Sequence, residues 1–364
     1  MIQFLMPTRV CFGENAVIEN AALFKAFGKK ALIVTGKRSA KRNGSYDDVL
    51  KALEMLGIES VLFDDIEENP SCETVDKAAA VAKAAEVDFA IGIGGGSPMD
   101  ASKAIAVLVK NPTLKARDLF TTPGLEAIPV IAVATTSGTG SEVTQYAIMT
   151  DHVDQTKKNY GQTVFPEVAF LDPKYTYDMP ISVTINTAVD AFSHLGEGYL
   201  GAKASPFSDS LAEKGFELFA ACIPALLKGE VTHEDRKSLM EASTLGGMVI
   251  AQTGTSLPHG MGYAMTYNKH VPHGMANGQL FAAFLKAFKD QSKVMKMLNK
   301  MGFETIEAFE SVLKQLIPVT VTLTEEEIET FTKGMTSNQA KLKNHPETVS
   351  DEEISGIYKQ SYGA

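Results

Sequence analysis

The chain has 364 residues, of which 45% are hydrophobic and 21% charged, as in a soluble globular protein long enough to hold two domains. Its net charge of -10 argues against a nucleic-acid partner, which would need a basic face. There is no signal-peptide pattern, and no apolar run approaches the roughly 20 residues of a membrane span. Three scattered cysteines, Cys11, Cys72 and Cys222, predict a reducing, cytoplasmic setting without a disulfide framework.

Up to about residue 175, short apolar runs alternate with amphipathic stretches. The runs predict strands at residues 31–35, 60–64, 87–93, 129–135 and 167–172. Residues 45–56 and 73–85 have the periodicity of helices. This alternation predicts an α/β fold with a mostly parallel, doubly wound sheet. Residues 181–362 carry helical periodicity almost throughout, so a domain boundary is expected near Met179–Ile181.

The strand at 31–35 is followed by Gly36 and a basic run. In dinucleotide sites, an acidic residue at such a strand end holds the ribose hydroxyls, whereas a basic one accommodates a 2′-phosphate. Gly36 has no carboxylate to repel a phosphate, and Lys37 and the Ser39 hydroxyl can bind one. The segment therefore favours NADP(H); a basic, solvated surface loop is the alternative.

The strand at 87–93 leads into three glycines at 94–96. Ser97 fits a helix N-cap and Pro98 the first helical position, and Asp100 completes a capping-box-like pair. The bare N–H groups and positive end of this helix can hold a pyrophosphate, which glycines allow to approach closely. The segment is neither a G-x-G-x-x-G fingerprint nor a P-loop, so a purely structural turn is the alternative.

The strand at 129–135 also ends in small polar residues, where hydroxyl side chains alternate with glycines. Parallel α/β sheets bind ligands beyond the carboxyl ends of their strands. A Ser/Thr-rich surface loop is the alternative explanation. The candidate cofactor-binding residues of these three segments are Gly36, Lys37, Ser39, Gly95, Gly96, Ser97, Asp100, Thr135, Thr136, Thr139 and Ser141.

Four residues of the second half have the spacing of metal ligands. Asp190 and His194 are four apart, which places both on one face of a helix. His259 and His273 are fourteen apart, each is followed by glycine, and the stretch between them can loop back. One carboxylate and three imidazoles suit Fe²⁺ or Zn²⁺, and a site without thiolates and with room for another ligand is of the catalytic type. Taken singly, an Asp and a His four residues apart on a helix are more often a surface pair, and a His before Gly is often a turn residue.

In this order, GGGSPMDASKA, TTSGTGSE, AFLDP and the four ligands resemble the iron-containing (group III) alcohol dehydrogenase family. MPTRVCFGENA and FDDIEENPS resemble the start of that family, and the resemblance covers essentially the whole chain. It implies a dinucleotide-binding Rossmann-like α/β domain over residues 1–179 and an all-helical metal-binding domain over 180–364. Dehydroquinate synthases and zinc glycerol dehydrogenases share this architecture. Asn69 and Lys157 are also expected to contact the cofactor.

The resemblance implies a homodimeric enzyme that transfers a hydride between NAD(P)(H) and a small alcohol, diol or aldehyde. A metal held by Asp190, His194, His259 and His273, Fe²⁺ with Zn²⁺ as the alternative, would lower the pKa of the alcohol, and the nicotinamide would accept the hydride. NAD-preferring members carry Asp where this chain has Gly36, so NADP(H) is expected, with NAD(H) as the alternative. The other function left open is a glycerol-dehydrogenase-like or dehydroquinate-synthase-like lyase enzyme on the same scaffold.

Two residues are candidates for proton transfer. Many family members carry a further His four residues after the first downstream ligand His, and here that position is Tyr263. A tyrosine hydroxyl can hydrogen-bond substrate, but an unperturbed pKa of about 10 makes it a poor base. His270, three residues before His273, either lines the same pocket or faces solvent.

Overall fold

The computed structural model describes residues 2–363. The chain forms two compact units, one from Met6–Met179 and one from Pro180 onward together with the residues before Met6. The first unit is built on a parallel sheet, and the second is helical. No helix among the described residues combines the length and the apolar character needed to cross a membrane.

The sheet of the first unit has six parallel strands in the order β1-β8-β5-β4-β2-β3. The strands are β1 (Arg9–Phe12), β2 (Lys30–Thr35), β3 (Glu59–Phe63), β4 (Phe89–Gly94), β5 (Val130–Ala134) and β8 (Val168–Leu171). All except β1 confirm strands predicted from apolar runs. None of the four side chains of β1 is buried, so this edge strand has no such run.

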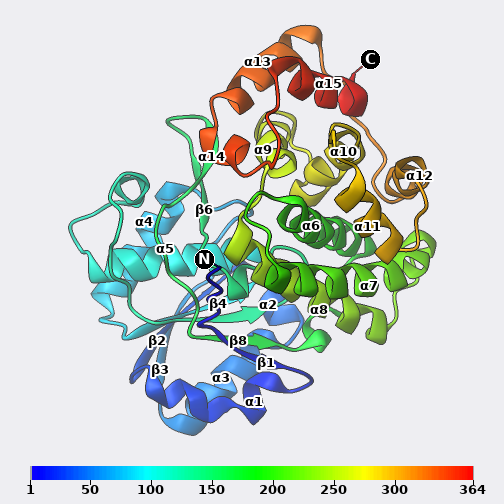
Figure 1. Ribbon diagram of the computed structural model, residues 1–364. Helices are drawn as coiled ribbons and strands as arrows, with labels where there is room; N and C mark the ends of the chain where they lie inside the picture. The colour runs from blue at the N-terminus through cyan, green and yellow to red at the C-terminus, as the bar shows by residue number, and fades with distance from the viewer. Residues whose placement is uncertain (1, 364) are drawn as a thin grey trace. The chain divides into compact units, whose positions relative to one another are not determined.

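Both faces of the sheet are covered, which is why its central strands are apolar along their whole length. Leu32 and Val34 of β2 pack in one hydrophobic cluster, and Ala31 and Ile33 pack in another, because successive side chains of a strand point to opposite faces. Figure 1 shows α4 (Cys72–Ala84) and α5 (Gly96–Lys110) on one side of the sheet, and α1 (Ala16–Glu19) and α3 (Ser45–Leu56) on the other.

A short antiparallel hairpin, β6 (Ile148–Asp151) with β7 (Thr156–Asn159), lies outside the main sheet. Its sequence is mostly polar and does not predict strands. The other elements of this unit are α2 (Ser39–Arg42) and the 3₁₀ turns η1 (Ala21–Ala26), η2 (Ala116–Phe120), η3 (Ser141–Val143) and η4 (Pro173–Thr176).

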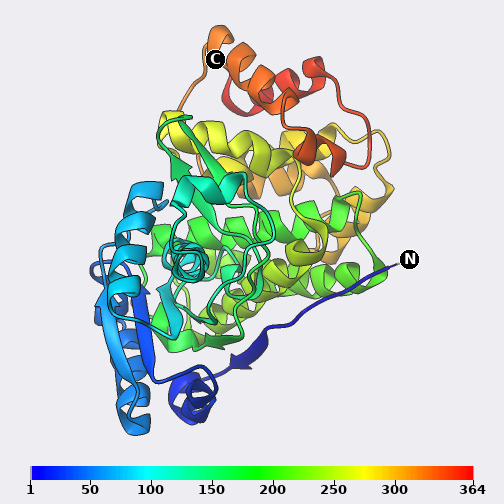
Figure 2. The same cartoon turned by 90° about the vertical axis from the view of Figure 1, so that its left-hand side faces the viewer.

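The helical unit is organised around α6 (Ile181–Leu200). Every residue of α6 from 188 to 200 is buried, as expected of a helix surrounded by others. Phe192 of this helix contacts the rings of Phe219, Phe281 and Phe309, with centroids 4.7 to 5.1 Å apart. The unit continues with α7 (Pro206–Lys228), α8 (His233–Thr253), α9 (Leu257–Lys269), α10 (His273–Lys286), α11 (Ser292–Lys300), α12 (Ile306–Leu316), α13 (Glu325–Thr336), α14 (Gln339–Lys343) and α15 (Asp351–Tyr362). Figures 1 and 2 both show α13, α14 and α15, in orange and red, gathered at one end of this unit.

Candidate functional site

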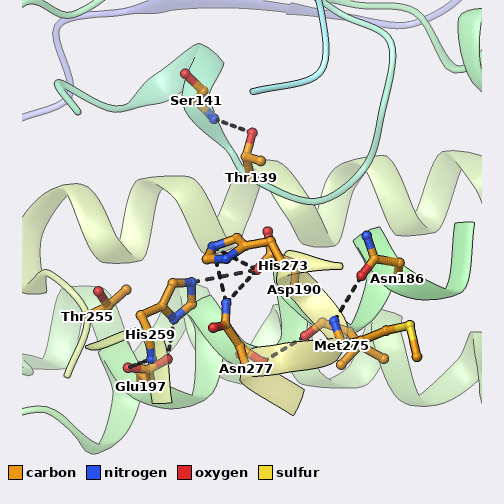
Figure 3. Close-up of polar contacts among 12 residues, drawn as sticks. Thr139, Ser141, Asn186, Asp190, Glu197, Thr255, His259, His273, Met275 and Asn277 are labelled. Atoms are coloured by element: carbon orange, nitrogen blue, oxygen red, sulfur yellow. Dashed lines mark hydrogen bonds and ion pairs between the residues drawn. The ribbon is translucent and has the colours of Figure 1, made fainter. Parts of the chain in front are cut away.

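Three side chains of the helical unit converge on one point (Figure 3). The ligand atoms of Asp190, His259 and His273 all lie within 4.8 Å of one another. His259 Nε2 is 3.6 Å and His273 Nε2 is 3.9 Å from Asp190 Oδ1. Two donors that are each about 2.1 Å from one ion lie roughly 3.0–3.5 Å apart. A small contraction of this cluster would therefore let it hold a divalent cation.

The fourth predicted ligand, His194, lies beside this cluster. It follows Asp190 by one turn of α6, and its ring stacks on that of His259 with centroids 4.4 Å apart. His194 is not among the three residues whose donor atoms converge most closely. The structure thus brings all four predicted residues together and places His194 at the edge of the group.

Burial and charge prepare the cluster for a cation. Burial raises the pKa of Asp190, but the imidazoles of His194, His273 and His259 outweigh this effect and hold the pKa below its usual range. His259 Nε2 is buried and has no hydrogen-bond partner among the described residues. A buried nitrogen without a partner is costly, and a bound metal would supply that partner. The residues present therefore fit a divalent metal.

Glu197 lies outside the residues that the sequence pattern predicts. It is fully buried on α6, and its carboxylate contacts Nδ1 of His259 and accepts a hydrogen bond from the backbone N–H of Ser256 at 2.7 Å. A carboxylate on one ring nitrogen fixes the tautomer that presents the other nitrogen to a metal. The spacing of Asp190, His194 and Glu197 at i, i+4 and i+7 is the signal that could have indicated it.

Two asparagines hold α10 against α6. Asn277 Nδ2 donates to Asp190 Oδ1 at 3.1 Å and lies 3.3 Å from His273 Nε2. Asn186 Oδ1 accepts from the backbone N–H of Met275 at 2.9 Å, near the start of α10 (Figure 3). These contacts place His273, the first residue of α10, next to the carboxylate of Asp190 on α6.

The stretch between the two downstream histidines is mostly the helix α9, and residues 270–272 connect it to α10. Both His-Gly pairs are helical, so the turn explanation for them is wrong. Gly274 follows His273 because α10 packs tightly on α6: a β-carbon there would lie 2.0 Å from the backbone oxygen of Asn186. Gly260 lies inside α9, where a β-carbon would be 2.7 Å from Met335 Sδ. Both glycines allow close packing of elements around the cluster.

The two candidates for proton transfer are placed differently. Tyr263 lies one turn after His259 on α9, and its ring stacks on His273 with centroids 5.8 Å apart and planes 17° apart. His270 is exposed and ends α9 in a left-handed conformation with φ 54. Only Tyr263 therefore lies against the cluster.

In the sheet unit, the helix after the glycine-rich turn begins two residues earlier than the sequence predicts. β4 ends at Gly94, whose φ of 151 is open to glycine, and α5 begins at Gly96 with Gly95 as N-cap. The predicted N-cap at Ser97 and first position at Pro98 are thus wrong, because Gly96 and Ser97 already belong to the first turn of α5. Gly95 provides no side-chain cap, so N–H groups of the first turn are available to an anion.

The predicted capping box is also wrong, because Asp100 is engaged elsewhere. Its carboxylate accepts hydrogen bonds from the Ser141 hydroxyl and, at 2.8 Å, from the backbone N–H of Ile148. Lys103, which is fully buried, donates to Ser141 Oγ, Ser141 O and Tyr146 O, each at 2.7 Å. Burial lowers the pKa of Lys103 to about 8. Asp100 and Ser141 therefore fasten the loop after β5 to α5, together with a lysine that the pattern of motifs does not predict.

Most other predicted cofactor residues surround the same turn. A β-carbon on Gly95 would lie 2.9 Å from Thr136 Oγ1, and one on Gly96 would lie 2.7 Å from Thr139 Cγ2. The backbone N–H of Thr135 donates to Gly94 O at 2.9 Å.

Asn69 completes this group. Its backbone N–H donates to Ser97 Oγ at 3.0 Å, and its Oδ1 accepts from Lys157 Nζ at 2.7 Å. The structure thus joins Asn69, Ser97 and Lys157, which are far apart in sequence, at the start of α5.

The basic run after β2 is partly neutralised. Lys37 pairs with Asp65 at 2.8 Å and Lys41 with Asp64 at 2.5 Å, and both aspartates follow β3. Ser39 is exposed at the first position of α2. Exposed ion pairs contribute at most about 1 kcal/mol each, so a phosphate can displace them.

Comparison with known proteins bears on both units. Residues 7–173 match the model of the iron-containing alcohol dehydrogenases, and residues 184–362 match the C-terminal part of the same family. The chain belongs to the iron-containing alcohol dehydrogenase family. It is 30% identical over 364 residues to an NADPH-dependent butanol dehydrogenase of Clostridium saccharobutylicum, covering 97% of this chain and 92% of that protein.

Solved structures agree with this family. An iron-containing alcohol dehydrogenase from Thermotoga maritima superposes with a TM-score of 0.93 at 40% identity, over 100% of both chains. An NADH-dependent butanol dehydrogenase A from the same organism superposes with a TM-score of 0.88 at 26% identity, over 100% of this chain and 98% of that one. The protein is therefore an oxidoreductase of a family that uses a metal and NAD(P), and whose named members differ in their choice between NADPH and NADH.

Proposed function

We propose that this protein is a metal-dependent alcohol dehydrogenase and aldehyde reductase, which transfers a hydride between NAD(P)(H) and a small alcohol, diol or aldehyde. The ligands of its metal, Fe²⁺ or alternatively Zn²⁺, are Asp190, His194, His259 and His273. The observation that carries this proposal is the convergence of the buried carboxylate of Asp190 with nitrogens of the buried His259 and the half-buried His273. Nε2 of His259 has no hydrogen-bond partner among the described residues. The homodimer implied by the family resemblance and the cytoplasmic setting predicted from the scattered cysteines stay part of the proposal.

A divalent metal bound there supplies a Lewis acid that polarises the oxygen of the alcohol or aldehyde. Two residues around the site position the ligands for this metal. Glu197 holds the Nδ1 side of His259 so that Nε2 is the free donor, and Asn277 orients the carboxylate of Asp190. The ionised Asp190 offsets part of the positive charge of the cation. Burial of Asp190 and His259 keeps water away from these groups and strengthens their interactions.

For the cofactor, we propose that the turn of Gly94, Gly95, Gly96 and Ser97 binds the pyrophosphate at the uncapped start of α5. We also propose a preference for NADP(H) over NAD(H). Gly36 places no carboxylate at the end of β2, and Lys37 and Ser39 are exposed beside it. The ion pair of Lys37 with Asp65 is weak enough to exchange for a phosphate.

The test is to strip the metal under anaerobic conditions, to restore Fe²⁺ or Zn²⁺, and to follow absorbance of the reduced cofactor with butanal. We expect NADPH to be oxidised only after metal is restored, and faster than NADH. Equal rates with and without metal would contradict the proposed role of the cluster. A clear preference for NADH would contradict the proposed cofactor choice and leave the metal chemistry intact.

A further inference from the structure

One lysine of the helical unit lies against Tyr263, the tyrosine that stacks on the predicted metal ligand His273. Lys341 is on the short helix α14, and its Nζ donates to the hydroxyl of Thr255. The same Nζ lies over the ring of Tyr263, 5.8 Å from its centroid. Tyr263 also stacks on His273, so the same aromatic ring contacts both the ammonium and that predicted ligand.

The charge of Lys341 has no close counter-ion. It forms no ion pair with any acidic side chain among the described residues. The carboxylate whose charge reaches it is that of Glu197, which already contacts His259 and accepts a hydrogen bond from Ser256. Burial lowers the pKa of Lys341 to about 8, and the attraction of Glu197 opposes this only in part. A partly desolvated cation without a counter-ion is costly, and an arriving anion would relieve that cost.

The fold of this segment does not depend on that charge. The Asn338 side chain caps α14 by accepting from the backbone N–H of Lys341. Asn344 Nδ2 donates to the backbone oxygen of Thr255 at 3.1 Å, which already fastens the end of α14 to the loop before α9. An ammonium group has three donors, and the Thr255 hydroxyl takes one of them. Its other two donors have no hydrogen-bond partner among the described residues.

We propose that Lys341 is a specificity-determining residue that binds an anionic group of the substrate, a carboxylate, sulfonate or phosphonate, while the aldehyde or alcohol end lies at the metal cluster. The substrate class is then a short oxo acid and its hydroxy acid. This inference rests on the proposed function. Lys341 exchanges no electrons: the cofactor gives its hydride to the carbonyl carbon, a proton goes to the oxygen, and the ion pair supplies binding and orientation.

The experiment compares kcat/KM for anionic and neutral aldehydes in the metal-loaded enzyme. The anionic substrates are succinic semialdehyde for the carboxylate and sulfoacetaldehyde for the sulfonate, and the neutral ones are butanal and propanal. The variants are Lys341→Met, Lys341→Arg and, as matched control, Lys343→Met, which removes an exposed lysine two residues away on the same helix. We expect the wild type to prefer an anionic substrate, and Lys341→Met to reduce that preference by about tenfold or more. Lys341→Arg should retain a large part of the preference and Lys343→Met all of it.

A second readout does not depend on turnover. Calorimetric binding of γ-hydroxybutyrate, compared with that of 1-butanol, should weaken in Lys341→Met and not in Lys343→Met. Whichever anion the wild type prefers identifies the group that Lys341 binds. An anionic-to-neutral ratio that is the same in wild type and Lys341→Met, with butanal turned over normally by the wild type, would overturn this inference and leave the proposed function standing. Absence of NAD(P)H-linked turnover of every aldehyde would instead overturn the proposed function, and this inference with it.

Discussion

The carboxylate of Glu197 contacts Nδ1 of His259, while Nε2 of the same ring lies 3.6 Å from Asp190 Oδ1. Both acids lie on α6, seven residues apart, and the histidine lies on α9. Burial lowers the pKa of His259, but the two carboxylates outweigh that effect and raise it. The ring of His259 is thus held between Glu197, which orients it, and Asp190, which would bind the same metal ion.

Replacing Glu197 with Gln keeps the shape of the side chain and removes its charge. Because the carboxylate fixes the tautomer and raises the basicity of His259, we expect metal affinity to fall about 10- to 100-fold. Equilibrium dialysis against a chelator measures this. Glu217→Gln, at an exposed position on α7, is the matched control and should bind metal like the wild type. Unchanged affinity in Glu197→Gln would show that the contact only supports the fold.

Replacing Lys103 with Met should destabilise the sheet unit. The change leaves Ser141 and Tyr146 without the donor that their oxygens share and leaves Asp100 without its nearby cation. Breaking such a buried network costs about 2–4 kcal/mol, which urea unfolding measures. Lys110→Met, at the exposed end of the same helix, should change stability by less than about 0.5 kcal/mol. A stability loss of the same size in both variants would contradict the network's role.

Cofactor binding should depend on the absence of β-carbons at the glycine turn. In Gly95→Ala the new methyl would lie 2.9 Å from Thr136 Oγ1 and in the path of an approaching phosphate, so we expect a cofactor dissociation constant raised at least tenfold. Metal content should stay at the wild-type level. Gly356→Ala, where a β-carbon meets open space, is the control. Normal cofactor titration of Gly95→Ala would mean that the turn is structural only.

The choice of cofactor should respond to a carboxylate at the end of β2. Gly36→Asp is expected to lower kcat/KM for NADPH by about tenfold or more, because its charge would repel the 2′-phosphate. A β-carbon at this position lies 3.3 Å from the backbone oxygen of Ile66, so Gly36→Ala separates the effect of bulk from that of charge. An equal loss of activity with NADPH and NADH in Gly36→Asp would contradict the assignment.

The three free thiols should differ in reactivity. Burial raises the pKa of both Cys72 and Cys222 to about 12, so at pH 8 very little of either is the reactive thiolate. Burial also raises the pKa of Cys11, but this side chain is partly exposed. Mass spectrometry after brief alkylation of the native protein should therefore find Cys11 labelled first. Earlier labelling of Cys72 or Cys222 would show that its surroundings open readily.

The fold could be predicted where burial leaves a clear pattern in sequence. The apolar runs of β2, β4 and β5 follow from a sheet covered on both faces, and the helical periodicity after residue 181 follows from packing around α6. The edge strand β1 and the polar hairpin of β6 and β7 bury too little apolar surface to produce a run. The sequence predicts the start of α5 two residues too late, because Ser97 resembles a cap, whereas the helix begins after Gly95, which offers no side chain as a cap.

At the candidate site, spacing alone suggested the ligands but not the residues that position them. The importance of Glu197 depends on α9 crossing α6, and that of Lys103 on the loop after β5 folding back on α5. Lys341 is 78 residues from Tyr263, the ring it lies over, and only the tertiary packing of α14 against α9 brings it there. Contacts between distant segments leave no local periodicity, so no sequence motif predicts them.

The central claim is that Asp190 and the histidines of α6, α9 and α10 bind one metal ion. Its most direct test is the stoichiometry and affinity of Fe²⁺ binding, measured anaerobically by equilibrium dialysis and elemental analysis, for the wild type, His273→Ala and His270→Asn. His270 is exposed and left-handed, a conformation that Asn tolerates, so His270→Asn is a control for the loss of a nearby histidine. We predict one tightly bound ion per chain in the wild type and in His270→Asn, and none retained by His273→Ala. Retention of one ion at wild-type affinity by correctly folded His273→Ala would contradict the account.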